Sequence, residues 1–228
     1  GCGKTFDMSE FGIFPSIPRH LFFDGNPPQN HQNKYSKHIA VISVYNSIMP
    51  EYRRVRINGG TYFITIVTYH RAPILMKPEA IEILRNTWET VSNNFPFLTD
   101  AICLLPDHLH CMITLPEHDS NYSIRIREIK RLFTKYYQSK FSGYSESDDS
   151  HRNKKEANIW QRRFWEHTIR DELDYMYHFD YIHYNPVKHG FVDQVSSWRW
   201  SSFHRYVKSG VYDLDWGQDG NWENNFGE

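Results

Sequence analysis

The chain has 228 residues, of which 39 % are hydrophobic and 16 % aromatic, enough for one domain of ordinary size with some additional material. No run of about 18 apolar residues occurs, so we expect neither a membrane-spanning segment nor a secretory leader. Cysteine is sparse and odd in number (Cys2, Cys103 and Cys111), which predicts a reducing, cytoplasmic location rather than a disulfide framework.

The net charge of −1 hides an uneven distribution along the chain. Between Asn121 and Arg170 there are twelve Lys and Arg against six Asp and Glu, whereas residues 212–228 carry five acidic residues and no Lys or Arg. A basic centre favours an anionic partner, although a solvated helix face would give the same count.

Regular structure is predicted to begin after residue 48. Residues 1–48 are rich in Pro, Asn and Gln and indicate an irregular extension. Residues 61–69 are β-branched and aromatic, which predicts a strand. Residues 77–96 predict a helix, because Pro78 suits a first helical position and apolar residues recur at helical spacing.

The middle of the chain predicts a hairpin and a second helix. Residues 97–105 and 108–115 read as two strands joined by a Pro-Asp turn. Residues 123–141 predict a helix whose basic residues fall between its apolar positions. The polar stretch 142–158 predicts a flexible loop, and residues 159–169 predict a short strand.

Residues 170–184 predict a third helix that Asn185 and Pro186 bring to an end, because proline disfavours the helical conformation in the residue before it. The order strand, helix, two strands, helix, short strand, helix predicts an α+β fold. We expect a ferredoxin-like antiparallel sheet with helices on one face, followed by an acidic C-terminal tail.

Two histidines flank Leu109 in the second hairpin strand. On a strand, His108 and His110 project from the same face, about 6–7 Å apart. Two imidazoles can bind one divalent cation and leave coordination positions for substrate oxygens. Because the chain has 13 histidines, a chance pair without a metal stays an alternative at this point, and Asp107 can be a turn residue or a ligand.

The predicted third helix carries a second candidate group. Tyr177, Tyr181 and Asn185 are four residues apart and share one helix face. An amide oxygen is an acceptable ligand for Mg²⁺ or Mn²⁺, so Asn185 would be a third ligand if this face packs near the hairpin. The alternative is a pair of core tyrosines with Asn185 as a helix cap before proline.

Together these segments resemble a known family over residues 51–217. The matching stretches read YRR, GGTYFITIVTY, LPDHLHCMITLPE, REIKRLFTK, IWQRRFWEHTIRDELDY, DYIHYNPVKHGFV and WRWSSFHRYVKSGVY. The chain resembles the REP-associated tyrosine transposases, a branch of the single-tyrosine HUH transposases. The resemblance implies a transposase domain over residues 49–212, with residues 1–48 outside it and an acidic tail over residues 213–228.

The resemblance implies a role for each candidate site residue. His108 and His110 become the paired ligands of Mg²⁺ or Mn²⁺, and Tyr181 becomes the nucleophile, four residues before the third ligand position. Related transposases carry glutamine at that position, where this chain has Asn185. Tyr184 is a competing nucleophile that we place second, because it is rotated from Asn185 by one step of about 100° around the helix.

The implied activity is metal-dependent nicking and rejoining of single-stranded DNA near palindromic hairpins, through a 5′-phosphotyrosine intermediate. The resemblance implies a nucleoid-associated cytoplasmic protein, either a monomer or a homodimer. Two other functions stay open: a hairpin-binding regulator without cleavage, and a metal nuclease that activates water.

An anionic substrate gives the basic residues of the middle segment a use, since phosphate contacts supply much of the affinity for DNA. Trp160 and Trp165 are candidates for stacking on unpaired bases, although core packing would also employ them. The predicted DNA-binding cations are Arg125, Arg127, Lys130, Arg131, Lys135, Lys154, Lys155, Arg162 and Arg163.

Overall fold

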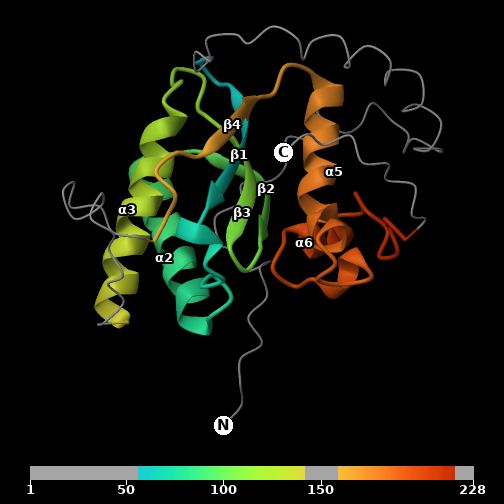
Figure 1. The fold of residues 1–228 in the computed structure, drawn as a ribbon. Helices are drawn as coiled ribbons and strands as arrows, with labels where there is room; N and C mark the ends of the chain where they lie inside the picture. Colours follow the sequence, from blue (N-terminus) through green and yellow to red (C-terminus); the bar gives the residue numbers. More distant parts are fainter. Residues whose placement is uncertain (1–55, 142–158, 219–228) are drawn as a thin grey trace, which may run out of the picture.

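The computed structural model describes residues 56–141 and 159–218, so the predicted extension at residues 1–48 and the predicted loop at residues 142–158 lie outside it. Four antiparallel strands form one sheet in the order β2-β3-β1-β4 (Figure 1). The strands are β1 (Thr61–Val67), β2 (Leu98–Leu104), β3 (His108–Thr114) and β4 (Trp165–Thr168). The main helices are α2 (Pro78–Asn94), α3 (Tyr122–Lys140), α5 (Glu172–Lys188) and α6 (Phe203–Lys208).

The predicted α+β class and order of elements are confirmed. The strand between residues 159 and 169 is β4, which pairs with β1 at the edge of the sheet. Strand β3 lies in the middle, between β1 and β2, and six of its seven residues are buried. A strand buried on both faces requires a cover on each side of the sheet.

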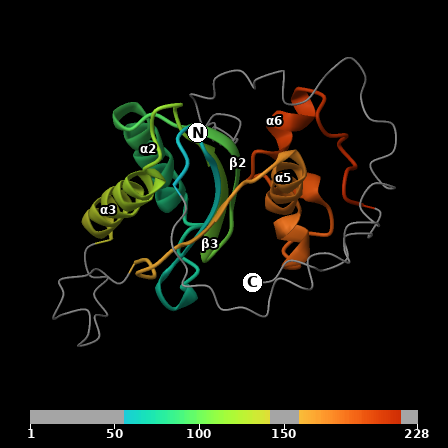
Figure 2. The same cartoon turned by 90° about the horizontal axis from the view of Figure 1, so that it is seen from above.

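Helices supply that cover on both faces, which refines the expectation of helices on one face. Ile64, Leu109 and Cys111 are buried in a cluster with side chains of α2 and α3. Phe63 and Met112, which alternate with them along the strands, are buried with side chains of α5 and α6. Viewed from above, α2 and α3 lie together on one side of the sheet and α5 on the other (Figure 2).

The third helix does not end at Asn185 and Pro186, so that prediction is wrong. Helix α5 contains Pro186 and continues to Lys188, and Gly190 follows it with a φ of 69°. Proline costs a helix one backbone hydrogen bond, but the helix continues past it, and the His189 N–H at its end still donates to the Asn185 carbonyl. The extra turn places Lys188 and His189 in the candidate site.

The packed part of the molecule extends past residue 212. Trp216 contacts Tyr212 with ring centroids 4.4 Å apart and Phe203 at 6.1 Å, so the start of the predicted acidic tail packs on the domain. Within residues 56–141 and 159–218, every helix is too short or too polar to cross a lipid bilayer.

Candidate metal and tyrosine site

His108 and His110 lie together on the α5 face of β3, as the alternation along a strand predicts. Their ring centroids are 4.9 Å apart, and the two residues are 3 % and 0 % exposed. Burial lowers the pKa of His110 well below its usual range, and the nearby charges of His108, His189 and Lys188 act in the same direction. His110 is therefore held in the neutral form that binds metals.

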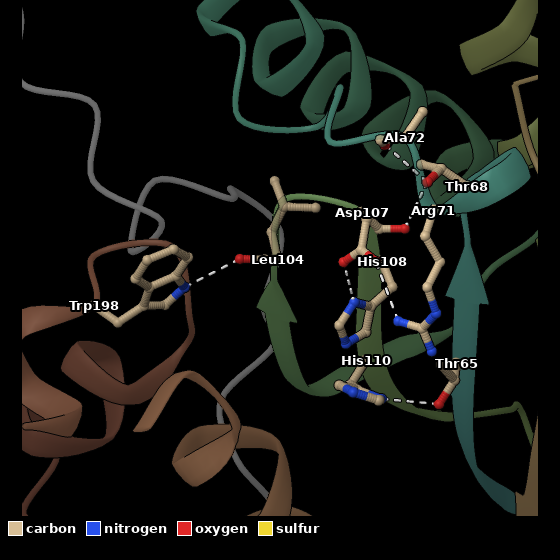
Figure 3. Close-up of polar contacts among 9 residues, drawn as sticks. All are labelled: Thr65, Thr68, Arg71, Ala72, Leu104, Asp107, His108, His110 and Trp198. Carbon is tan, nitrogen blue, oxygen red and sulfur yellow. Dashed lines mark hydrogen bonds and ion pairs between the residues drawn. The ribbon is translucent and has the colours of Figure 1, made fainter. Parts of the chain in front are cut away.

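Each of these histidines has one ring nitrogen engaged by a neighbouring side chain (Figure 3). His108 Nδ1 lies 2.6 Å from Asp107 Oδ1, and His110 Nδ1 lies 2.8 Å from Thr65 Oγ1. Arg71 Nη1 donates to the other carboxylate oxygen of Asp107 at 3.1 Å. Partners of this kind orient a histidine so that its Nε2 atom is the one that can ligate a metal.

Asp107 is held as a carboxylate. Burial opposes its ionisation, but hydrogen bonds from His108 and Arg71 outweigh burial and lower the pKa of Asp107 below its usual range. An ionised Asp107 accepts from the Nδ1–H of His108, which fixes the ring tautomer.

The loop that carries Arg71 has an unusual backbone. His70 and Arg71 have φ angles of 52° and 53°, in the left-handed region that non-glycine residues rarely occupy. Thr68, which is fully buried, ties this loop to the turn before β3, because its backbone N–H and its hydroxyl both donate to the Asp107 carbonyl at 2.8 Å. Such strain persists where surrounding contacts determine the conformation, often at functional sites.

Tyr181 meets the histidine pair within one chain. Its ring centroid lies 5.3 Å from that of His110 and 5.7 Å from that of Phe63. Lys188 Nζ donates a hydrogen bond of 3.3 Å to the Tyr181 hydroxyl and lies 4.8 Å from the centre of its ring. The predicted nucleophile therefore lies beside the predicted ligands, with a cation at its oxygen.

On helix α5, Asn185 lies between Tyr181, which contacts His110, and His189, which contacts His108. It follows Tyr181 by one helical turn and precedes His189 by another, and the His189 ring lies 5.2 Å from that of His108. The residue is 0 % exposed, and within the part of the chain that the structure describes neither Oδ1 nor Nδ2 has a hydrogen-bond partner. A buried amide without a partner is costly, and a metal bound to its oxygen would relieve that cost.

Tyr184, the competing nucleophile, packs toward the C-terminal segment. Its ring centroid lies 6.4 Å from that of Trp216, and its ring atoms lie close to Gly217. This contact favours Tyr181 as the reactive tyrosine.

The prediction that Arg125 binds DNA is wrong. Arg125 is 1 % exposed, and its guanidinium donates to the Pro96 and Asn121 carbonyls and pairs with Asp119 at 2.7 Å. The apolar spacing of α3 did not reveal this, because Arg125 lies at the start of the helix and closes the loops beside it. Arg125 stabilises the fold and is not accessible to a phosphate.

The other predicted cations differ in their surroundings. Helix α3 covers the sheet face opposite the histidine pair, so its basic residues do not lie in the candidate site. Arg127 and Arg131 pair with Glu128, and Lys130 donates to the Gln161 and Arg162 carbonyls. Lys135, Arg162 and Arg163 are exposed, and Lys154 and Lys155 lie outside the described residues.

Sequence reasoning missed Arg71 and Lys188 as the cations beside the histidines. The signal for Lys188 was present, since it lies three residues after Asn185 and so shares its helix face. Arg71 had no such signal, because only the folded loop brings it to Asp107.

A second group of potential ligands joins β4 to the start of α5. His167 Nε2 lies 2.8 Å from Asp174 Oδ2, and His178 Nδ1 lies 3.1 Å from Asp174 Oδ1. Arg170 Nε also donates to Asp174 Oδ2, at 2.9 Å. These bonds already satisfy the carboxylate, so the group acts as a clamp between strand and helix. The spacing of Asp174 and His178 by four residues on the predicted helix was the available signal.

Comparison with known proteins identifies the family. The model of the family described as "Transposase IS200 like" matches residues 57–185. A REP-associated tyrosine transposase of Escherichia coli strain K12 is 44 % identical over 171 residues, which cover 75 % of this chain and 93 % of that protein. A Haemophilus influenzae protein with the same type of name is 46 % identical over 169 residues, which cover 74 % of this chain and 94 % of that protein.

A solved structure agrees with these relatives. A REP-associated tyrosine transposase bound to a REP hairpin is 43 % identical, with a TM-score of 0.61 over 75 % of this chain and 93 % of that chain. The chain therefore belongs to the IS200-like transposase family, within its REP-associated tyrosine transposases, which are DNA-cleaving enzymes.

Proposed function

We propose that this transposase nicks and rejoins single-stranded DNA beside a hairpin, with Tyr181 as the nucleophile. The observation that carries the proposal is the contact of the Tyr181 ring with His110, 5.3 Å between centroids, in the same chain. The solved relative, which is bound to a REP hairpin, supports hairpin DNA as the ligand.

The residues around the histidine pair fit a hard divalent cation. His108 Nε2, His110 Nε2 and the Asn185 amide oxygen would hold Mg²⁺ or Mn²⁺, and the orphaned buried amide of Asn185 is the best support for this ligand set. When bound, such an ion withdraws charge from a phosphate oxygen and fixes the phosphate for in-line attack.

In the proposed reaction the Tyr181 oxygen forms a bond to phosphorus and the bond from phosphorus to the 3′ oxygen breaks. The phenol loses its proton to solvent, and the departing 3′ oxygen gains one to become a hydroxyl. Phenols have a pKa of about 10, so a cation that favours the phenolate assists attack at neutral pH. Lys188, which donates to the Tyr181 oxygen, is placed to do this.

Rejoining is the reverse reaction. A 3′ hydroxyl attacks the phosphotyrosine, and the phenolate leaves more readily than a sugar alkoxide would. The covalent link conserves the energy of the phosphodiester bond, so no ATP is needed.

The test is a covalent adduct between the protein and a labelled oligonucleotide that carries a hairpin and its single-stranded flank. We expect wild type and Tyr184→Phe to form the adduct with Mg²⁺ or Mn²⁺, and Tyr181→Phe to form none. A hairpin-binding regulator would form no adduct in any variant. A nuclease that activates water would still cleave after Tyr181→Phe and leave a product without protein.

We further propose that one chain supplies a complete site, because His110 and Tyr181 meet within it. Mixing Tyr181→Phe with His110→Ala should then restore no adduct. Recovered activity in the mixture would indicate that tyrosine and histidines come from different chains of a dimer.

A further inference from the structure

Trp165 is an exposed tryptophan on the edge of the sheet. It begins β4, the edge strand, and remains 50 % exposed, whereas Trp160, the other candidate for base stacking, is 5 % exposed and belongs to the core. Exposing a large aromatic side chain forgoes the stabilisation that its burial would give.

The register of the sheet places Trp165 on the same face as the histidine pair. Trp165 lies opposite Thr65 on β1, and Thr65 lies opposite His110 on β3. Residues directly opposite one another in antiparallel strands share a face, so Trp165 lies two strand spacings, about 10 Å, from His110. The next residue, Glu166, is buried on the other face, where it accepts a hydrogen bond from the Tyr122 hydroxyl.

Aromatic contacts join Trp165 to the nucleophile. The Phe63 ring lies 5.5 Å from that of Trp165 and 5.7 Å from that of Tyr181. On the same strand as Trp165, His167 stacks on it at 6.1 Å with the two planes 8° apart. The hydrogen bond from His167 to Asp174 fixes that ring, so Trp165 has a rigid aromatic neighbour.

Helix α5 leaves Trp165 itself half exposed. Its most extensive contacts are with β2 and β3, whereas Trp165 lies on the opposite edge strand of the same face. The exposed Arg162 and Arg163 precede Trp165 by three and two residues, in the segment that leads into β4. An exposed aromatic ring with cations nearby in the chain suits the binding of unpaired bases and their phosphates.

We propose that Trp165, backed by His167, is a stacking site for one unpaired nucleobase of the cleaved strand, next to the scissile phosphate. This inference rests on the proposed function, since it assumes that the scissile phosphate lies at the histidine pair. Stacking would anchor the single-stranded flank while the hairpin is held elsewhere on the protein. Because every base has an aromatic face, the site would hold the strand without fixing its sequence.

The test measures binding without cleavage, in a Tyr181→Phe background. The fluorescent base 2-aminopurine, whose emission falls on stacking, replaces each base of the single-stranded flank in turn. We expect quenching at one position, which Trp165→Ala abolishes and Trp165→Phe retains. Affinity for the flanked hairpin should fall roughly 5- to 100-fold with Trp165→Ala, as for other base-stacking aromatics.

Tyr136→Ala is the matched control, because Tyr136 is 45 % exposed and lies on α3, across the sheet from the site. Its affinity should change less than about twofold, as is usual for surface substitutions. An abasic nucleotide at the quenched position should lower the affinity of the wild-type protein as much as the Trp165→Ala substitution does. It should not lower the affinity of the Trp165→Ala variant any further.

Other outcomes overturn the inference. Quenching that survives Trp165→Ala refutes it. So does an abasic substrate that lowers the affinity of Trp165→Ala as much as it lowers that of wild type. A loss of affinity in Tyr136→Ala equal to that in Trp165→Ala also refutes it. Thermal unfolding of each variant establishes that it is folded. If wild type forms no covalent adduct but quenching depends on Trp165, the stacking site stands and the cleavage proposal fails.

Discussion

At the scale of single residues, the proposed chemistry depends on which ring nitrogen each histidine presents. Asp107 takes the Nδ1–H of His108 and is itself held by Arg71. The partner of His110 Nδ1 is the neutral hydroxyl of Thr65 rather than a carboxylate. The charged partner constrains His108 more strongly than the neutral partner constrains His110.

Asp107→Asn should therefore weaken metal binding without removing a ligand. We expect the metal concentration for half-maximal adduct formation to rise about 10- to 100-fold, with recovery at saturating Mn²⁺. Glu128→Gln is the control, because Glu128 is an Arg-paired carboxylate on the opposite side of the sheet. A defect in Asp107→Asn that saturating metal does not rescue would contradict a role in orienting His108.

At the scale of elements, α5 is fixed at both ends. Its first turn is capped by the Asp171 side chain, and Asp174 clamps it to β4 through His167. Its last turn continues past Pro186 and contacts the histidine pair through His189. The position of Tyr181 midway along the helix thus follows from both attachments.

Asp174→Asn should loosen the first attachment. Burial opposes ionisation of Asp174, but hydrogen bonds from His167, His178 and Arg170 outweigh it and hold the pKa well below its usual range. A lowered pKa gives stability that is present above about pH 4 and lost as the pH falls. We expect the variant to lose about 1–3 kcal/mol at pH 7 by denaturant unfolding. The difference in free energy of unfolding between the variant and wild type should be smaller at pH 3. An equal difference at both pH values would count against an ionised Asp174.

The elements show where sequence reasoning stops. Periodicity located β1, β3, α2 and α3 because each has a clear apolar pattern. It did not assign faces to the helices, since an apolar stripe is compatible with either side of a sheet. The end of α5 was misplaced because the local preference of proline was outweighed by contacts of the following turn. Tyr181 and the histidines were proposed from spacing, but their meeting required the packed helix.

At the scale of the whole molecule, the face that carries the site also holds two acids with raised pKa values. Asp180 accepts a hydrogen bond of 2.5 Å from Tyr212, and burial raises its pKa to about 7. Burial likewise raises the pKa of Asp100 to about 6, against opposing contacts with Thr114 and Arg205. Both acids therefore hold a proton more readily in the folded protein than in the unfolded chain.

This predicts a fold that loses stability as the pH rises. An acid with a raised pKa contributes stability below its unfolded value of about 4 and loses it as the pH passes the folded value. As the pH rises from 4.5 to 8, we expect ionisation of Asp180 alone to lower the free energy of unfolding by roughly 2–4 kcal/mol. In denaturant unfolding, Asp180→Asn should be as stable as wild type at the lower pH and more stable than wild type at the higher pH. The exposed Asp193→Asn serves as the control, and parallel pH profiles for wild type and Asp180→Asn would contradict the prediction.

Strand β3 serves two layers of the molecule with alternate residues. His108 and His110 face α5, whereas Leu109 and Cys111 face α2 and α3. A slip of β3 by a single position would exchange these sets, presenting a leucine and a thiol to the substrate and forcing imidazoles among hydrocarbons. Misaligned molecules would therefore be unstable as well as inert, so faulty folding would not yield a long-lived enzyme that binds its DNA without cutting it.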